Sequence, residues 1–208
     1  MIIVHHLENS RSQRILWLLE ELGLDYEVRR YARDPKTMLA PPELRAIHPL
    51  GKSPILEEEA VTYVESGAIM AQLAERHGRF GPPEDPVGAR RWHQYMHYAE
   101  GSLLPPLFAM LVVRKLGLLG LPARKPIAGR IHEQLRFVEG ELEGRDWFCG
   151  DELTAADMMM SFPLEAAGSR IDDMAATYPA IRRFLERCHA RPAYQRALAR
   201  GGEYAYAG

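Results

Sequence analysis

The sequence contains only two cysteines, Cys149 and Cys188, and they are far apart. Zinc sites and redox-active dithiols need cysteines at close, regular spacing, and the chain has no Cys-x-x-Cys pair. We therefore expect no bound metal and no thioredoxin-type dithiol. Two isolated cysteines are typical of buried, reduced thiols.

An excess of charge of either sign is also missing, because 26 lysines and arginines nearly balance 28 aspartates and glutamates. No basic run interleaved with aromatic residues is present, which argues against nucleic-acid binding. The sequence has no apolar run of membrane-spanning length, and its opening MIIVHH lacks the positive start of a signal peptide. We expect a cytoplasmic protein with neither a nucleic-acid nor a membrane partner. With 208 residues, the chain is long enough to bury a sizeable core.

The first part of the chain alternates between strand and helix signals. β-Branched runs and period-two alternation predict strands, and apolar residues three and four apart predict helices. The expected elements are strands at 2–6 and 25–31, a helix at 12–22 ending at Gly23, a helical turn at 42–47, two strands within 48–66 and a helix at 66–77. Arg11, Arg14, Glu20 and Glu21 are expected on the polar face of the first helix. The order β-α-β-α-β-β-α is that of a thioredoxin-like domain over residues 1–78.

Strand signals stop after a stretch rich in proline, RFGPPEDP at 79–86, which is typical of a linker. Residues 87–208 are predicted to form an all-α domain. Its first long helix is expected to bend at Pro105 and Pro106, because prolines remove backbone donors. Thr154 and Asp157 have the spacing of a capping box at a helix start.

The most informative stretch is HPLGKSPILEEEAVTYVES, at 48–66. Pro54 marks a strand start or a fixed turn, where a cis bond is tolerated, and such a turn leaves the backbone of Ser53 free to pair with an extended peptide. Glu65 and Ser66 begin a helix, whose N-terminus attracts carboxylates. The alternative is an ordinary trans turn with an N-cap serine and a solvated Lys52.

The ordered set PLGKSPIL and ESGAI resembles the glutathione-binding segment of the glutathione S-transferase family, which reads NPxGKVPxL and ESxAI. His48 replaces the usual asparagine here, and Ser53 replaces the usual valine. The capping box and the segment 178–194 also resemble this family, so the resemblance spans the chain. It implies glutathione as co-substrate, no tightly bound cofactor and a homodimer.

The resemblance also implies roles for individual residues. Ser10 corresponds to the serine that stabilises the glutathione thiolate in serine-type, theta-like members, although a serine here also suits an N-cap. Asn9 and Ser12 are alternative donors. The expected glutathione-binding residues are Lys52, Ser53, Pro54, Glu65, Ser66 and, from the helical domain, Glu100. The expected electrophile pocket is lined by Tyr95, Phe108, Met110 and Leu111. The alternative is that these residues belong to the hydrophobic core and line no pocket.

The function implied is conjugation of the glutathione thiolate to hydrophobic electrophiles. A thiol titrates near pH 8.5, so a hydrogen-bond donor to the sulfur is needed to favour the thiolate at neutral pH. A glutathione-dependent peroxidase or disulfide reductase on the same fold is one alternative, which Asn9 would favour. A non-catalytic, glutathione-binding interaction module is another, because fold does not imply function.

Overall fold

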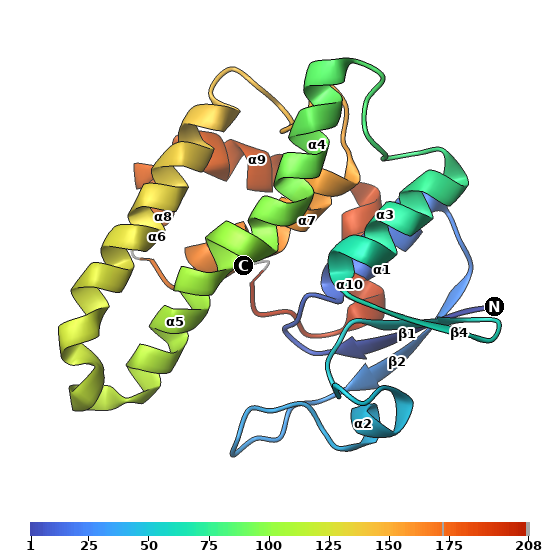
Figure 1. Cartoon of the computed structure of the whole chain (residues 1–208), viewed down its shortest axis with the longest axis horizontal. Helices are drawn as coiled ribbons and strands as arrows, with labels where there is room; N and C mark the ends of the chain where they lie inside the picture. Colours follow the sequence, from blue (N-terminus) through green and yellow to red (C-terminus); the bar gives the residue numbers. More distant parts are fainter. Residues whose placement is uncertain (172, 207–208) are drawn as a thin grey trace. The chain divides into compact units, whose positions relative to one another are not determined.

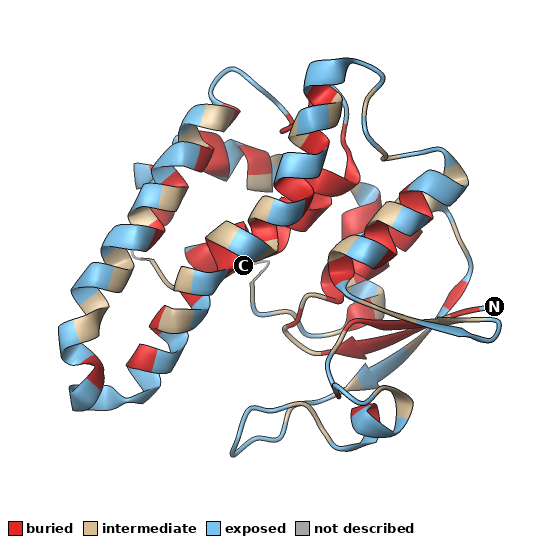
Figure 2. Cartoon of the chain, in the orientation of Figure 1, coloured by how far each residue is buried: buried red, intermediate tan, exposed pale blue. Residues whose placement is uncertain are grey.

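The computed structural model describes residues 1–171 and 173–206. The chain divides into two compact units: Met1–Gly81 together with the segment from Cys188 onward, and Pro82–Arg187. Each unit has its own set of buried residues, whose ribbon is coloured red in Figure 2. None of the helices in the described ranges has both the length and the apolar character needed to cross a membrane.

The first unit is built on a mixed four-stranded sheet (Figure 1). Its strands are β1 (Ile2–Leu7), β2 (Tyr26–Tyr31), β3 (Ile55–Glu58) and β4 (Val61–Val64), in the spatial order β2-β1-β3-β4. β1 is parallel to β2 and antiparallel to β3, and β3 is antiparallel to β4. Val4 lies opposite Val28 on β2 and Leu56 on β3, so the middle of β1 is the centre of the sheet.

Three helices complete this arrangement: α1 (Gln13–Leu22), α2 (Glu43–Ile47) and α3 (Ser66–His77). A parallel strand pair needs a crossover connection, and α1 supplies it between β1 and β2. α1 ends at Gly23, whose φ of 71° is left-handed and whose N–H bonds to carbonyls in the last turn. The order β-α-β-α-β-β-α confirms the predicted thioredoxin-like domain.

The second unit is helical, as predicted. Its helices are α4 (Pro86–Tyr98), α5 (Leu104–Lys115), α6 (Leu121–Leu142), α7 (Ala155–Gly168), α8 (Met174–Thr177) and the start of α9 (Pro179–His189). All residues of α7 from Ala155 to Ala167 are buried, so this helix is central to the core of the unit. Cys149 and Cys188 are both buried, in agreement with the sequence prediction.

The predicted capping box is present at the start of α7. The carboxylate of Asp157 accepts the backbone N–H of Thr154 and that of Phe148, each at 2.7 Å. Because Asp157 is fully buried, its two backbone contacts fix both the helix start and the preceding loop.

The connection between α4 and α5 contains a feature that the sequence did not predict. A π-helical stretch, η1 (Ala99–Leu103), joins the two helices directly before Pro105 and Pro106. Since proline has no N–H, the carbonyls four residues earlier, of Gly101 and Ser102, have no α-helical donor. In the π-helical stretch the N–H of Leu104, the last residue before the prolines, donates to the carbonyl of Ala99, five residues back.

The C-terminal helix α10 (Pro192–Gly201) corrects the domain division expected from the sequence. Residues 87–208 were assigned to one helical domain, but the segment from Cys188 onward belongs to the first unit. Trp17 of α1 and Tyr194 of α10 pack edge to face with ring centroids 5.2 Å apart. Helical periodicity shows that α10 has an apolar face, but it does not show which core that face joins.

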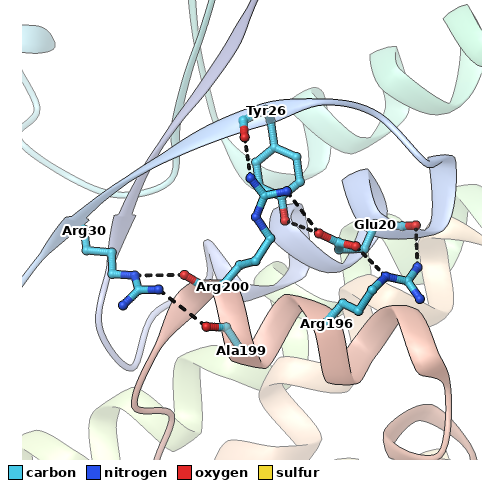
Figure 3. Close-up of polar contacts among 6 residues, drawn as sticks. All are labelled: Glu20, Tyr26, Arg30, Arg196, Ala199 and Arg200. Atoms are coloured by element: carbon cyan, nitrogen blue, oxygen red, sulfur yellow. Dashed lines mark hydrogen bonds and ion pairs between the residues drawn. The ribbon is translucent and has the colours of Figure 1, made fainter.

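A charged cluster on α1, β2 and α10 holds this helix in place (Figure 3). The Glu20 carboxylate accepts hydrogen bonds from the Tyr26 hydroxyl at 2.8 Å and from Arg196 at 2.7 Å. The guanidinium of Arg200 lies 3.8 Å from the centre of the Tyr26 ring. Arg30 donates to the carbonyl of Arg200 at 2.8 Å, at the end of α10.

Glu20 is the acceptor at the centre of this cluster. Burial alone would raise the pKa of its carboxyl, but hydrogen bonds from Arg196 and Tyr26 and the charges of Arg196 and Arg200 together hold the pKa below its usual value. A carboxyl with a depressed pKa stabilises the fold above its unfolded pKa, and that contribution disappears as the pH falls through the folded pKa.

We therefore expect Glu20→Gln to lower the free energy of unfolding by about 1 kcal/mol at neutral pH, because charge-assisted hydrogen bonds are lost. Urea unfolding, followed by tryptophan fluorescence, measures this difference. The difference should shrink below about pH 4, where the wild-type carboxyl becomes protonated. Glu186→Gln is the matched control, because Glu186 pairs with Arg182 on an exposed helix surface. A difference that stays constant down to about pH 3 contradicts the assigned role of Glu20.

Candidate functional site

The turn before β3 has the geometry that the sequence allowed. The peptide bond between Ser53 and Pro54 is cis, and Pro54 is buried next to the first residue of β3. Pairing between β1 and β3 stops at His5 and Ile55, because Pro54 has no N–H with which to continue it. The Ser53 hydroxyl continues the pairing instead: it donates to the carbonyl of His5 at 2.8 Å and accepts the N–H of Leu7 at 3.1 Å.

This use of the Ser53 side chain leaves its backbone open. Among the described residues, neither the N–H nor the C=O of Ser53 has a hydrogen-bond partner. Lys52, directly before it, is exposed. An extended ligand can therefore pair with the Ser53 backbone as an additional strand, with a cation beside it.

The start of α3 is the second part of the site. Glu65 precedes the helix with a φ of 72° and is exposed, whereas Ser66, the first helical residue, is buried. The first intrahelical hydrogen bond runs from the Ile69 N–H to the Glu65 carbonyl, so the N–H groups before it point out of the helix end. A carboxylate is stabilised at such an end.

Sequence reasoning missed one residue here. Arg14 was expected on the polar face of α1, but it is 1% exposed and donates to the Ser66 hydroxyl at 3.2 Å. The contact joins residues 52 positions apart, so it could not be read from the local pattern. The available signal was an arginine directly before the apolar run that begins at Ile15.

The loop between β1 and α1 carries Ser10 as its central residue. The Ser10 hydroxyl is buried, lies 2.8 Å from the Ser12 hydroxyl and accepts the backbone N–H of Ser12 at 3.3 Å. Ser12, not Ser10, occupies the N-cap position of α1. Ser12 makes no side-chain cap hydrogen bond, whereas the Ser10 hydroxyl accepts the N–H two residues on, as an N-cap serine does, so the N-cap alternative for Ser10 stays open. Ser12, the other candidate donor, is fully buried and lies 2.9 Å from Nδ1 of His6.

Asn9 has a different environment. Its backbone has a φ of 50°, and its side-chain oxygen accepts the backbone N–H of Ala205 at 2.7 Å. The carbonyl of Asn9 accepts a hydrogen bond from Arg33 at 3.3 Å. With the oxygen held in this way, the amide NH2 end is the part of Asn9 that remains for a ligand.

These residues meet at the carboxyl end of β1. The N–H of Leu7 donates to the Ser53 hydroxyl, and the Leu7 carbonyl lies 3.5 Å from the Ser12 hydroxyl, which contacts Ser10. Arg14, one turn into α1, then reaches Ser66 at the start of α3. The first unit thus combines an open backbone edge, a helix N-terminus and a buried hydroxyl.

The candidates from the second unit separate into two groups. Tyr95 is fully buried and donates its hydroxyl to Glu141, and Met110 is 4% exposed, so both are core residues that offer almost no surface to a ligand. Phe108 and Leu111 on α5 are 60% and 36% exposed. Glu100 is half-buried on η1.

The described parts of the chain contain no group of three or more His, Cys, Asp or Glu side chains that could hold a metal ion. The polar side chains that lie around the end of β1 include hydroxyl, amide and guanidinium groups. All of these are hydrogen-bond donors, which suits an anionic ligand.

Such a thioredoxin-like domain with an open cis-proline edge, followed by a helical domain, defines the class of protein. Two family models match the chain: "Glutathione S-transferase, N-terminal domain" over residues 10–76 and "Glutathione S-transferase, C-terminal domain" over residues 125–192. Glutathione S-transferase 3 of Schizosaccharomyces pombe is 36% identical, with 93% of this chain and 85% of that protein covered. The chain belongs to the glutathione S-transferase family.

Two further comparisons refine this result. The crystal structure of a glutathione S-transferase from Actinobacillus pleuropneumoniae superimposes with a TM-score of 0.90 at 36% identity, covering 99% of this chain and 95% of that one. The disulfide-bond oxidoreductase YfcG of Escherichia coli is 27% identical over 95% of this chain and 94% of its own length.

The role of the Ser53 side chain leads to a prediction about stability. Ser53→Ala leaves the buried N–H of Leu7 without an acceptor, so the free energy of unfolding should fall by about 1–2 kcal/mol. Ser53→Thr keeps the hydroxyl and is the matched control. Urea unfolding of the three proteins measures the effect. Equal stability of the alanine variant and the wild type would show that the hydroxyl does not continue the strand pairing.

Proposed function

We propose that the protein conjugates the glutathione thiolate to hydrophobic electrophiles. The observation that carries the proposal is the attachment of two elements to Leu7: the turn with the open Ser53 backbone and the loop with the buried Ser10 hydroxyl. An extended tripeptide paired with Ser53 would have its central residue, the cysteine, at this point of the sheet edge.

Each end of glutathione has a chemically suitable partner in this scheme. The glycine carboxylate meets the Lys52 ammonium as a charge pair. The γ-glutamyl carboxylate binds the N–H groups and the Ser66 hydroxyl at the start of α3, and its amino group meets the Glu65 carboxylate. Arg14, bonded to Ser66, adds a buried positive charge behind the anion.

Ser10 stabilises the sulfur in its thiolate form by donating its hydroxyl proton in a hydrogen bond. The thiol proton leaves to solvent, and Ser10 keeps its own proton. The thiolate then attacks the electrophilic carbon, so that a C–S bond forms. With a chloronitrobenzene, the C–Cl bond breaks and chloride leaves with the electron pair. Phe108 and Leu111 are the proposed contacts for the apolar electrophile because both are exposed.

We also propose a cytoplasmic homodimer, in which Glu100 of one protomer reaches the γ-glutamyl amino group bound by its partner. This proposal rests on the family resemblance.

A disulfide reductase is the second candidate function, and Asn9 supports it. Its oxygen is held by Ala205, which leaves the amide NH2 as a possible donor to sulfur in place of Ser10. The relative YfcG is named as a disulfide-bond oxidoreductase. In that reaction the bound thiolate attacks a disulfide sulfur, a mixed disulfide forms, and a second thiolate leaves.

The two functions predict different effects of substitution. For a transferase, Ser10→Ala should raise the pKa of bound glutathione by about one unit, equivalent to about 1.4 kcal/mol of lost thiolate stabilisation. Thiolate absorbance as a function of pH measures this pKa. Asn9→Ala should leave it unchanged. If Asn9→Ala raises the pKa and Ser10→Ala does not, and if disulfides or hydroperoxides are turned over faster than a chloronitrobenzene, the reductase is favoured. Absence of glutathione binding would favour an interaction module.

The role of Lys52 can be tested with a modified ligand. Lys52→Gln should weaken glutathione binding about fivefold, since one exposed charge pair contributes about 1 kcal/mol. The glycyl ethyl ester of glutathione has no charge at that end, so its affinity for the two proteins should be similar. Titration calorimetry measures all four affinities. An equal loss for both ligands contradicts a direct contact with the glycine carboxylate.

A further inference from the structure

Two buried side chains beneath Ser10 have no part in the function proposed above. His6, on β1, is 2% exposed, and Ser12 is fully buried. They form a continuous polar chain with Ser10: Nδ1 of His6 lies 2.9 Å from the Ser12 hydroxyl, which lies 2.8 Å from the Ser10 hydroxyl. The direction of the hydrogen bonds along this chain determines where the Ser10 proton points.

Each hydroxyl has one proton to donate, so the position of the His6 hydrogen limits the arrangements of this chain. If Nδ1 of His6 accepts the Ser12 proton, the Ser12 oxygen must accept the Ser10 proton, and Ser10 then has none for a ligand. If Nδ1 carries a hydrogen, it donates to the Ser12 oxygen. The Ser12 proton can then go to the Ser10 oxygen or to the Leu7 carbonyl, and in the first case the Ser10 proton is released.

The environment of the His6 ring favours the second arrangement. Burial and the nearby charge of Arg30 lower the pKa of His6 to about 4, so the ring is neutral at physiological pH and has a single N–H. Within the described ranges, Nε2 has no hydrogen-bond partner. A hydrogen on Nδ1 has an acceptor in the Ser12 hydroxyl, whereas a hydrogen on Nε2 has none within the described ranges, so we place the hydrogen on Nδ1.

The surroundings of Ser10 agree with this direction. The Ser12 hydroxyl lies 2.8 Å from the Ser10 oxygen but 3.5 Å from the Leu7 carbonyl, which makes Ser10 the better acceptor. The Ser10 oxygen also accepts the backbone N–H of Ser12 at 3.3 Å. Both lone pairs of that oxygen are then occupied, and its own proton is available only to a group outside this network.

We propose that His6 and Ser12 are positioning residues that orient the Ser10 hydroxyl as a donor toward the glutathione sulfur. This inference rests on the proposed function, in which Ser10 contacts that sulfur. His6 and Ser12 touch neither glutathione nor the electrophile. They act by filling the acceptor positions of the Ser10 oxygen, and the polarised hydroxyl becomes a stronger donor.

The first test needs no substitution and no glutathione. A long-range proton–nitrogen correlation spectrum of the wild-type protein identifies which ring nitrogen of His6 carries the hydrogen. We expect the Nδ1–H form at neutral pH. The Nε2–H form would overturn the inference, because Ser10 would then donate to Ser12.

The second test is a double-mutant cycle on the pKa of bound glutathione. Ser12→Ala should raise this pKa by about half a unit in the wild type, because Ser10 loses its polarising donor. In a Ser10→Ala background, the same substitution should have no effect. Ser161→Ala is the matched control: Ser161 is also a buried serine, but it donates to the Met158 carbonyl within α7 and should leave the pKa unchanged.

The outcomes separate the two proposals. If Ser10→Ala leaves the thiol pKa unchanged, the proposed role of Ser10 fails first. If Ser10→Ala raises it while Ser12→Ala has no effect, or has the same effect in both backgrounds, only the inference about His6 and Ser12 fails. Should Ser12→Ala not fold, His6→Leu replaces it in the cycle with the same expected shift.

Discussion

The site depends on how one strand end is paired after a proline interrupts the pairing. Pro54 cannot donate a hydrogen bond, so the pairing of β3 with β1 stops at Ile55. The Ser53 hydroxyl takes over by bonding to both His5 and Leu7. A side chain thus satisfies the backbone of β1, and the backbone of Ser53 is left for a ligand. A valine at this position would fill space but could not make these two bonds.

Most of the fold could be predicted because its signals are local. Apolar spacing in α1, alternation in β2 and the capping box of α7 each involve residues within a few positions of one another. The assignment of α10 to the first unit was not predictable in this way. It depends on Glu20 and Tyr26 meeting Arg196 and Arg200, more than 170 positions later.

The residues of the candidate site show the same difference between local sequence signals and contacts between distant residues. The sequence identified the segment around Lys52 and the helix start at Ser66, because both belong to one continuous stretch. It missed the burial of Arg14, since the partner of Arg14 is distant in sequence. It also offered Tyr95 as a pocket residue, because spacing cannot distinguish a helix face in the core from one that lines a pocket.

The buried polar groups of the first unit explain why a hydroxyl can suffice for the chemistry. In the proposed transferase reaction Ser10 is not a nucleophile, and its proposed contribution is one hydrogen bond with the sulfur. Such a bond is worth more where water is excluded and where the donor is already oriented before the ligand arrives. In our proposal His6 supplies that orientation without adding charge, because its pKa of about 4 keeps the ring neutral. A protonated ring at this position would be a donor at both nitrogens, and it would carry a buried positive charge that no carboxylate in the network balances.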